Sequence, residues 1–386
     1  MRGHVAKKGK NYYAVIYEGV DPGTGKERHR WHAAGPRRSD AERLVNELVG
    51  RRQRGDDTVA DRATLGSYLT DRWLPLQESR LRPTTYLSYR STIELHVVPH
   101  IGKLRLDKLQ ADDLEGLYVH LLRNGRRNGK GGGLSPTSVR YVHRVLHKAL
   151  GDAHRKGIVV RNVAALADPP KVRANGPKSK IQVWDAADLR RFLAATAEHR
   201  HHTLWILAAK SGMRRGELLG LRWNDIDLDA AAISVHHAVV TAGYTLHVSD
   251  VKTATGRRTI NLDARTTEAL RARRTNQEKV AAEAGERFDP HGLVFGRPGG
   301  DPIHPELITR TFDRLVAKHK LPRIRFHDIR HTHATLLLKA GVPAKVVSER
   351  LGHATPGFTL NVYQHVLPGM QAEAAVVFDQ LIEDDE

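Results

Sequence analysis

Apolar residues recur at helical spacing along residues 60–166. The pattern predicts helices over about 64–76, from Thr84 to just before Pro99, over 111–123, and from Pro136 onward. Ser135 suits the N-cap of the fourth helix, and Pro136 suits its first turn. The inward positions predicted for that helix are Val139, Val142, Leu146, Ala149, Leu150 and Ala153. We therefore expect residues 60–166 to form a four-helix domain.

Residues 1–58 combine a β pattern with many basic side chains. Tyr12, Val15 and Tyr17 lie in a β-prone run, a turn signal follows at Asp21–Gly25, and a second run ends at Trp31. A helical pattern begins after these runs, near residue 39. The prediction is a three-stranded sheet backed by one helix. A disordered basic arm is the alternative, and the β pattern argues against it.

Residues 167–182 have the composition of a linker, with Asp168–Pro170 followed by basic residues around Asn175–Pro177. The remainder, 183–386, mixes helical and β patterns. Helices are predicted over about 185–197, 201–210, 214–221, 264–283, 304–319, 326–340 and 343–351, with a last one from Pro368. A strand near 232–240 precedes a predicted hairpin with arms at 245–251 and 257–262. The expected fold class is a multidomain, mainly α protein with small β-sheets.

Net charge narrows the choice of partner. The 386 residues hold 62 Lys and Arg against 43 Asp and Glu, a formal charge of +19. Such a charge repels itself unless a polyanion neutralises it, which favours nucleic acid first and an anionic membrane surface second. The chain contains no cysteine, which excludes disulfides, thiolate zinc sites and a cysteine nucleophile. It also lacks any run of about 18 apolar residues, and we expect a soluble cytoplasmic protein.

Basic side chains gather in four stretches before residue 183. They are the N-terminal domain, a Gly-rich loop at 124–133, one face of the fourth helix, and the linker. The candidate DNA contacts in these stretches are Lys7, Lys8, Lys10, Arg126, Arg127, Lys130, Arg140, Arg144, Lys148, Lys171, Arg173 and Lys178. A solvated helix face is the alternative for the fourth helix. The loop does not follow a strand or end in Gly-Lys-Ser/Thr, which argues against a nucleotide-binding P-loop.

The C-terminal half holds the residues best suited to chemistry on a phosphodiester. His327 and Arg330 are spaced to share one helix face. The planar fork of an arginine binds two non-bridging phosphate oxygens, and Arg214 and Lys252 would add further positive charge. Such a cluster neutralises the charge that builds in a pentacoordinate transition state, and it needs no metal ion.

Other interpretations of these residues stay open. His327, His331 and His333 invite a zinc site, although Arg330 between them would repel a cation. Tyr363 lies after this cluster and could serve as a nucleophile. Tyr12, Tyr13, Tyr86, Tyr89 and Tyr141 are competing tyrosines, but none of them lies near His327 and Arg330 in sequence. Arg215 and Arg222 are alternatives to Arg214 as the arginine of this cluster. Arg257 and Arg258 are alternatives to Lys252 as a further cation.

Two segments carry a resemblance to a known family. Ser211–Trp223, with the acidic residues after it, resembles the first signature box of the tyrosine recombinases, the phage integrase family. Phe326–Thr332 resembles the second box, which Leu351–His353 and Tyr363 complete. The helical stretch before residue 166 is similar to the family's core-site-binding domain, and the first 55 residues resemble its arm-site domain. The resemblance implies a SAM-like helical domain and a mixed α+β catalytic domain.

The resemblance also implies roles for six residues. Tyr363 would be the nucleophile, and Arg214 and Arg330 would clamp the scissile phosphate. Lys252 would protonate the 5′-oxygen, His327 would be the acid–base partner, and His353 would contact the phosphate. Glu217 is expected to be structural. Two departures are Ser211, where the family more often has threonine, and Pro356–Gly357, which lengthens the segment before Tyr363.

The implied activity is site-specific DNA recombination, as in the integration or excision of a mobile element or viral genome. Strands would be exchanged through a 3′-phosphotyrosyl intermediate and a Holliday junction without ATP, metal or cofactor. The implied partners are double-stranded core and arm sites, three further copies of the chain in a tetramer, and an accessory excision or bending factor, all at the bacterial nucleoid. The alternatives are a catalytically inactive DNA-binding relative and a metal-dependent nuclease.

Overall fold

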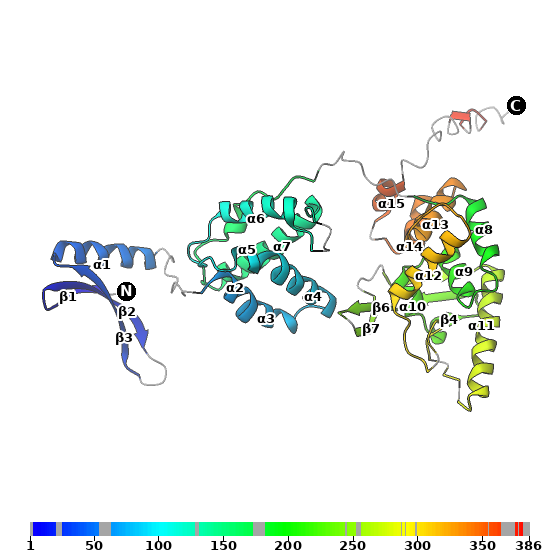
Figure 1. Ribbon diagram of the computed structural model, residues 1–386, viewed down its shortest axis with the longest axis horizontal. Helices are drawn as coiled ribbons and strands as arrows, with labels where there is room; N and C mark the ends of the chain where they lie inside the picture. The colour runs from blue at the N-terminus through cyan, green and yellow to red at the C-terminus, as the bar shows by residue number, and fades with distance from the viewer. Residues whose placement is uncertain are drawn as a thin grey trace. The chain divides into compact units, whose positions relative to one another are not determined.

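The computed structural model of the chain divides into two compact units, Met1–Gly176 and Pro177–Glu386 (Figure 1). The structure describes residues 3–20, 25–53, 63–127, 131–172, 182–243, 245–251, 256–286, 288–289, 291–297, 299–353, 355–363, 375–376 and 378–380. No helix among them is long and apolar enough to cross a membrane.

The N-terminal part is a three-stranded antiparallel sheet with one helix packed on it. Strands β1 (Gly3–Lys8), β2 (Asn11–Val20) and β3 (Glu27–Gly35) pair in that order, and α1 (Arg38–Gln53) contacts all three. Ala14, Val15 and Ile16 are buried. Trp31 is 52% exposed, and its ring packs edge-on against Tyr13. The predicted sheet and helix are confirmed.

The second part is a helical bundle. Its first helical run comprises α2 (Leu65–Ser67), η1 (Tyr68–Trp73) and α3 (Leu74–Glu78), and its second comprises α4 (Pro83–Thr92), η2 (Ile93–Val97) and α5 (Val98–Ile101). Then come α6 (Ala111–Asn124), α7 (Pro136–Arg155) and the short η3 (Val163–Ala165). Helix α7 begins as predicted, since the Ser135 hydroxyl accepts the Ser138 N–H at 3.1 Å. All six inward positions predicted for it are buried.

The second predicted helix does not end before Pro99. It continues to Ile101 because residues 93–97 form a π-helical turn, which accommodates the proline. Pro99 has no N–H to offer the carbonyl of Leu95, four residues earlier. The Arg127 guanidinium supplies the missing donor, with Nη2 3.0 Å from that carbonyl. A side chain predicted to contact DNA thus already has one backbone partner.

The C-terminal unit joins helices to two small sheets. Its helices are α8 (Ala186–Ala195), α9 (His202–Ser211), α10 (Arg215–Leu219), η4 (Trp223–Asp225), α11 (Ala264–Glu283), α12 (Pro305–Lys318), α13 (Asp328–Lys339), α14 (Ala344–Leu351) and α15 (Pro356–Tyr363). Its strands are β4 (Ile226–Asp227), β5 (Ala232–Val235), β6 (His237–Ala242), β7 (Thr245–Asp250) and β8 (Arg258–Asn261). The mainly α prediction with small sheets is confirmed.

The predicted pairing of the β insertion is wrong. The run 232–240 is two strands: β6 forms a hairpin with β7, while β5 pairs with β4 and β8. The predicted pairing of 245–251 with 257–262 does not occur. Ile233 and Ile260 lie opposite each other and are both buried, whereas β7 has no buried side chain. Burial of apolar area therefore favours the pairing of β8 with β5.

An aromatic core fixes the helices that carry the candidate site. The rings of Trp184, Phe192, Trp205 and Phe312 lie 5.1–6.1 Å apart, and Phe326 packs against the last two. These residues belong to α8, α9, α12 and the segments before α8 and α13. The core therefore fixes the position of α9 relative to the start of α13.

Candidate active site

Arg330 is buried at the meeting point of two chain segments. It lies on α13, is 4% exposed, and donates from Nη1 to the Gly212 carbonyl and from Nη2 to the Leu351 carbonyl, each at 2.7 Å. Gly212 ends α9 with φ of 63°, a left-handed conformation that suits glycine. The guanidinium is thereby fixed between the end of α9 and the end of α14.

Arg214 is held at the same place by different contacts. It precedes α10, where Glu217 accepts both the Arg214 backbone N–H at 2.9 Å and Nη1 at 2.7 Å. Its Nη2 donates to the Gly352 carbonyl at 3.1 Å. The Arg214 side chain is 42% exposed. The two arginines therefore bond to successive carbonyls at the end of α14, and Arg214 is the more accessible of the two.

Two histidines complete this cluster in their neutral forms. Burial, followed by the charges of Arg330 and Arg214, lowers the pKa of His353 to about 4. Its Nδ1 lies 2.8 Å from the hydroxyl of Thr359 on α15. His327 remains accessible to solvent, while desolvation of its ring and then Arg330 lower its pKa. A bound phosphate would favour the protonated form of each ring, because an opposite charge raises a histidine pKa.

The structure thus brings together four of the six predicted catalytic residues: Arg214, His327, Arg330 and His353. Lys252 lies outside the described residues, between the end of β7 and the start of β8. Tyr363 is the last residue of α15, and its side chain lies outside the described part of the chain. Pro356 begins α15, so the long segment before Tyr363 folds as a helix that packs on α14.

Sequence reasoning missed the role of Arg258. Its side chain is only 7% exposed, and Nη2 lies 2.9 Å from Glu217 Oε2 while Nε donates to the Arg350 carbonyl at 2.8 Å. Burial alone raises the pKa of Glu217, but Arg258 and then Arg214 outweigh it, so the pKa lies below its usual range. The alternation of buried and exposed positions around Ile260 was the signal that could have marked Arg258 as inward-facing.

His333 is a structural histidine. Its Nδ1 donates to the Ala209 carbonyl at 2.8 Å, and its Nε2 accepts from Arg350 Nε at 3.2 Å. The two partners fix the tautomer, because a carbonyl only accepts and a guanidinium only donates. Both ring nitrogens are therefore occupied by protein groups, which argues against the zinc alternative at His333.

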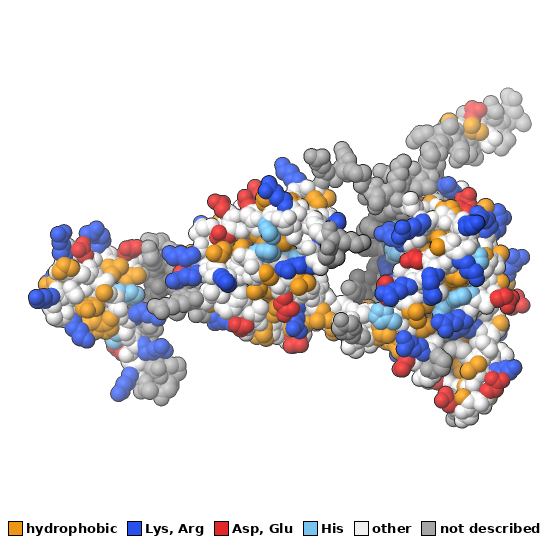
Figure 2. Space-filling model, in the orientation of Figure 1, with side chains coloured by type: hydrophobic (Ala, Val, Ile, Leu, Met, Phe, Trp, Pro, Cys, Tyr) orange, Lys and Arg blue, Asp and Glu red, His pale blue; other side chains and the backbone are white. Residues whose placement is uncertain are grey.

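The candidate DNA contacts that the structure describes are exposed. Figure 2 shows Lys and Arg side chains over the surface of each part. On α7, Arg140, Arg144 and Lys148 are exposed, and the Arg144 guanidinium lies 5.2 Å from the ring centre of Tyr141. Further exposed candidates are Lys7, Lys8, Lys10, Arg126, Arg127 and Lys171. The remaining candidates, Lys130, Arg173 and Lys178, lie outside the described residues.

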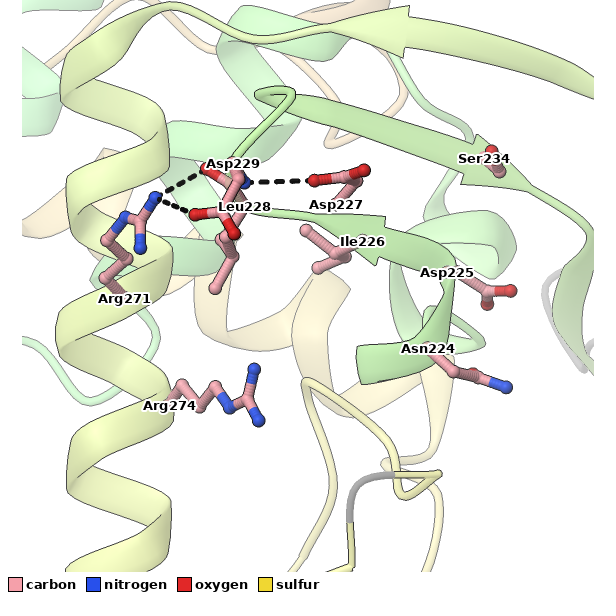
Figure 3. A pocket seen from close by; sticks show the side chains of 9 residues that line it. All are labelled: Asn224, Asp225, Ile226, Asp227, Leu228, Asp229, Ser234, Arg271 and Arg274. Atoms are coloured by element: carbon pink, nitrogen blue, oxygen red, sulfur yellow. Dashed lines mark hydrogen bonds and ion pairs between the residues drawn. The ribbon is translucent and has the colours of Figure 1, made fainter.

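A pocket of about 460 Å³ lies elsewhere in the C-terminal unit (Figure 3). Asp225, Asp227 and Asp229 line it together with Arg271, which donates to Asp229 and to the Leu228 carbonyl. Arg274 lines it as well. None of the four predicted catalytic residues whose side chains the structure describes lines this pocket, so the arginine cluster remains the candidate active site.

Two family models match the chain. Residues 182–369 match the phage integrase family, and residues 64–122 match the phage integrase N-terminal SAM-like domain. The chain is 26% identical over 376 residues to the ICEBs1 integrase of Bacillus subtilis, covering 96% of this chain and 97% of that protein. It is 24% identical over 394 residues to a XerC-like tyrosine recombinase of Caldanaerobacter subterraneus, covering 97% of each.

Solved structures share the fold. The Tn1549 transposon integrase in complex with transposon right end DNA aligns with a TM-score of 0.64 at 20% identity, over 83% of this chain and 99% of that one. A lambda integrase dimer bound to a COC′ core site aligns with a TM-score of 0.54 at 18% identity, over 93% of each chain.

Proposed function

The chain belongs to the phage integrase family, and from that premise we propose that it is a tyrosine site-specific recombinase that integrates or excises a mobile DNA element. The observation that supports this most strongly is the placement of the two arginines. Arg214 and Arg330, far apart in sequence, bond to successive carbonyls beside His353. Two guanidiniums fixed side by side match the non-bridging oxygens of a phosphodiester.

In the proposed reaction the Tyr363 phenol attacks the scissile phosphorus. Its proton passes to His327, whose pKa is lowered in the protein alone and would be raised by the phosphate, so that DNA binding increases the affinity of the imidazole for the proton. The bond from phosphorus to the 5′-oxygen breaks, and Lys252 protonates that oxygen as it leaves. Arg214 and Arg330 stabilise the charge on the equatorial oxygens. A phenol with a pKa of about 10 is ionised in roughly one molecule in a thousand at neutral pH, so this cationic surrounding is needed.

The products explain why no energy source is required. A 3′-phosphotyrosyl bond and a free 5′-hydroxyl replace one phosphodiester, so the bond energy is retained in the covalent intermediate. A 5′-hydroxyl from a partner duplex then reverses the step on a new strand, through a Holliday junction. Four copies of the chain would carry out the four cleavages on two sites.

Each part of the chain has a place in this proposal. Residues 1–58 would bind arm sites through the sheet, and residues 60–166 would bind the core site through the basic face of α7. Residues 167–182 would link them to the catalytic domain, 183–386, so that the two clasp the duplex. An accessory bending or excision factor would set the direction of the reaction, which takes place on DNA in the bacterial cytoplasm.

A nicked suicide duplex tests the proposal. The duplex carries the attachment site that flanks the gene, with a nick close to the cleavage point so that the short fragment diffuses away. We expect a covalent protein–DNA adduct in the presence of a chelator, lost in Tyr363→Phe and retained in the control Tyr86→Phe. Failure of the native chain to form an adduct would reject the recombinase. Binding without cleavage would favour the inactive relative, and cleavage only with a divalent ion would favour a nuclease.

A further inference from the structure

Three arginines converge on the last turn of α14. The consecutive carbonyls of Arg350–Gly352 accept from Arg258 Nε at 2.8 Å, Arg330 Nη2 at 2.7 Å and Arg214 Nη2 at 3.1 Å, respectively. Carbonyls in the last turn of a helix have no partner within the helix, and they form its negative end. Cationic donors are therefore stabilised there. The three arginines fix three separate segments of the chain to the same helix end.

Arg258 is the arginine of this group that has no role in the proposed chemistry. It is the first residue of β8, and its forked side chain faces the Glu217 carboxylate, with Nη1 at 3.3 Å from Oε1 and Nη2 at 2.9 Å from Oε2. The same carboxylate binds Arg214 through the side chain and the backbone. Glu217 is 3% exposed, so its charge is compensated by these two arginines and scarcely by water.

This arrangement makes Arg258 able to position Arg214. If Arg258 were absent, the buried carboxylate would retain Arg214 as its nearest cation and draw the guanidinium away from the Gly352 carbonyl. The Arg350 carbonyl would lose its donor at the same time. A lysine at position 258 would keep the charge, but its single ammonium cannot reproduce the paired contacts with both carboxylate oxygens.

We propose that Arg258 is a positioning residue for the phosphate clamp: through Glu217 and the Arg350 carbonyl it sets Arg214 in register with Arg330. The proposal rests on the proposed recombinase function.

Single-turnover cleavage of the suicide duplex measures the effect. We expect Arg258→Lys to lower the cleavage rate constant at saturating DNA by about 10- to 100-fold, the loss expected when a reacting group is displaced by about 1 Å. The DNA dissociation constant should change by less than about threefold, since Arg258 does not reach solvent. The control Arg274→Lys replaces a half-buried arginine paired with Glu278 and should change neither quantity.

A second variant pair separates positioning from general stability. In Arg258→Met the buried carboxylate keeps its charge and captures Arg214. Adding Glu217→Gln removes that charge, so the double variant should cleave faster than Arg258→Met alone. If the losses in cleavage rate caused by Arg258→Met and Glu217→Gln simply add in the double variant, the two residues are not coupled through the carboxylate and the proposal is wrong.

Hydrogen exchange gives a readout that does not depend on activity. The amides of Gly352 and His353 donate to Glu349 and Ser348 at the end of α14. Their exchange should accelerate about tenfold or more in Arg258→Lys if Arg258 holds this helix end. Unchanged exchange in Arg258→Lys would overturn the positioning proposal, whether or not the native chain forms an adduct. Absence of an adduct with the native chain would reject only the recombinase function. Faster exchange with unchanged cleavage would also overturn it, because Arg258 would then be purely structural.

Discussion

His333 gives the C-terminal unit a stability that depends on pH. The side chain is 7% exposed and lies between the Ala209 carbonyl and the Arg350 guanidinium. Burial, and then the charge of Arg350, lower its pKa from 6.5 to about 4. Protonation would place a hydrogen on Nε2, the nitrogen that accepts the Arg350 N–H. His333 therefore binds a proton less readily in the folded unit than in the unfolded chain.

The sign and size of the effect follow from these two pKa values. Because the folded-state pKa lies below the unfolded value, the stabilisation is complete above pH 6.5 and is lost as the pH falls towards 4. The loss from this one group is about 2 kcal/mol at pH 5 and about 3 kcal/mol at pH 4. These values are a large part of the stability of an ordinary domain, about 5–15 kcal/mol.

Urea denaturation of the native chain and of His333→Gln tests this reasoning. Tryptophan emission follows unfolding, because three of the five tryptophans, Trp184, Trp205 and Trp223, lie in this unit. The native chain should be the more stable at pH 7, and its advantage over the variant should shrink by about 2 kcal/mol at pH 5. His291→Gln, at an exposed position in the same unit, serves as the control and should show a constant difference. A constant difference for His333→Gln would refute the account.

Three further predictions concern packing and DNA binding. Gly212→Ala should lower the free energy of unfolding, measured by urea denaturation, more than the control Gly341→Ala does. Both glycines have positive φ, but a Cβ at Gly212 would lie 2.7 Å from two side-chain carbons. Trp73→Phe should lower stability by about 1–3 kcal/mol in the same assay, because the buried Asp152 carboxylate loses the indole N–H at 2.9 Å. DNA affinity should fall steeply with salt, and Arg144→Ala should reduce the slope of that dependence by about one; an unchanged slope would exclude this phosphate contact.

Local features of the fold were predictable because their signals are local. Helix α7 shows this: one residue caps it, Pro136 begins it, and every apolar position at helical spacing is buried. The β insertion was not predictable in the same way. Nothing in the run 232–240 marks the break at His236, and the partner of Ile233 is decided by a side chain 27 positions later in the chain, Ile260.

The residues of the candidate site likewise fall into those that the sequence locates and those that it does not. Arg214 and Arg330 stand in recognisable boxes, so the resemblance located them. Arg350 acts mainly through backbone carbonyls, those of Lys210 and Asn261. Every residue has a carbonyl, so a sequence does not mark which ones will accept an arginine. For Arg258 the strand alternation around Ile260 indicates an inward-facing side chain, but only the folded chain shows that its partners are Glu217 and the Arg350 carbonyl.

The charges at the end of α14 favour a phosphate as a binding partner. The guanidiniums of Arg214, Arg258 and Arg330 bond to successive carbonyls there, and two of them, Arg214 and Arg258, share the Glu217 carboxylate. Helix-end carbonyls offset part of the excess, and the nearby His353 stays neutral because a further cation would be unfavourable. A phosphodiester would supply the anion that balances this cluster, and it would make His353 easier to protonate. Arg214 and Arg330, which bond to the end of α14, are therefore also the groups that would bind the DNA backbone.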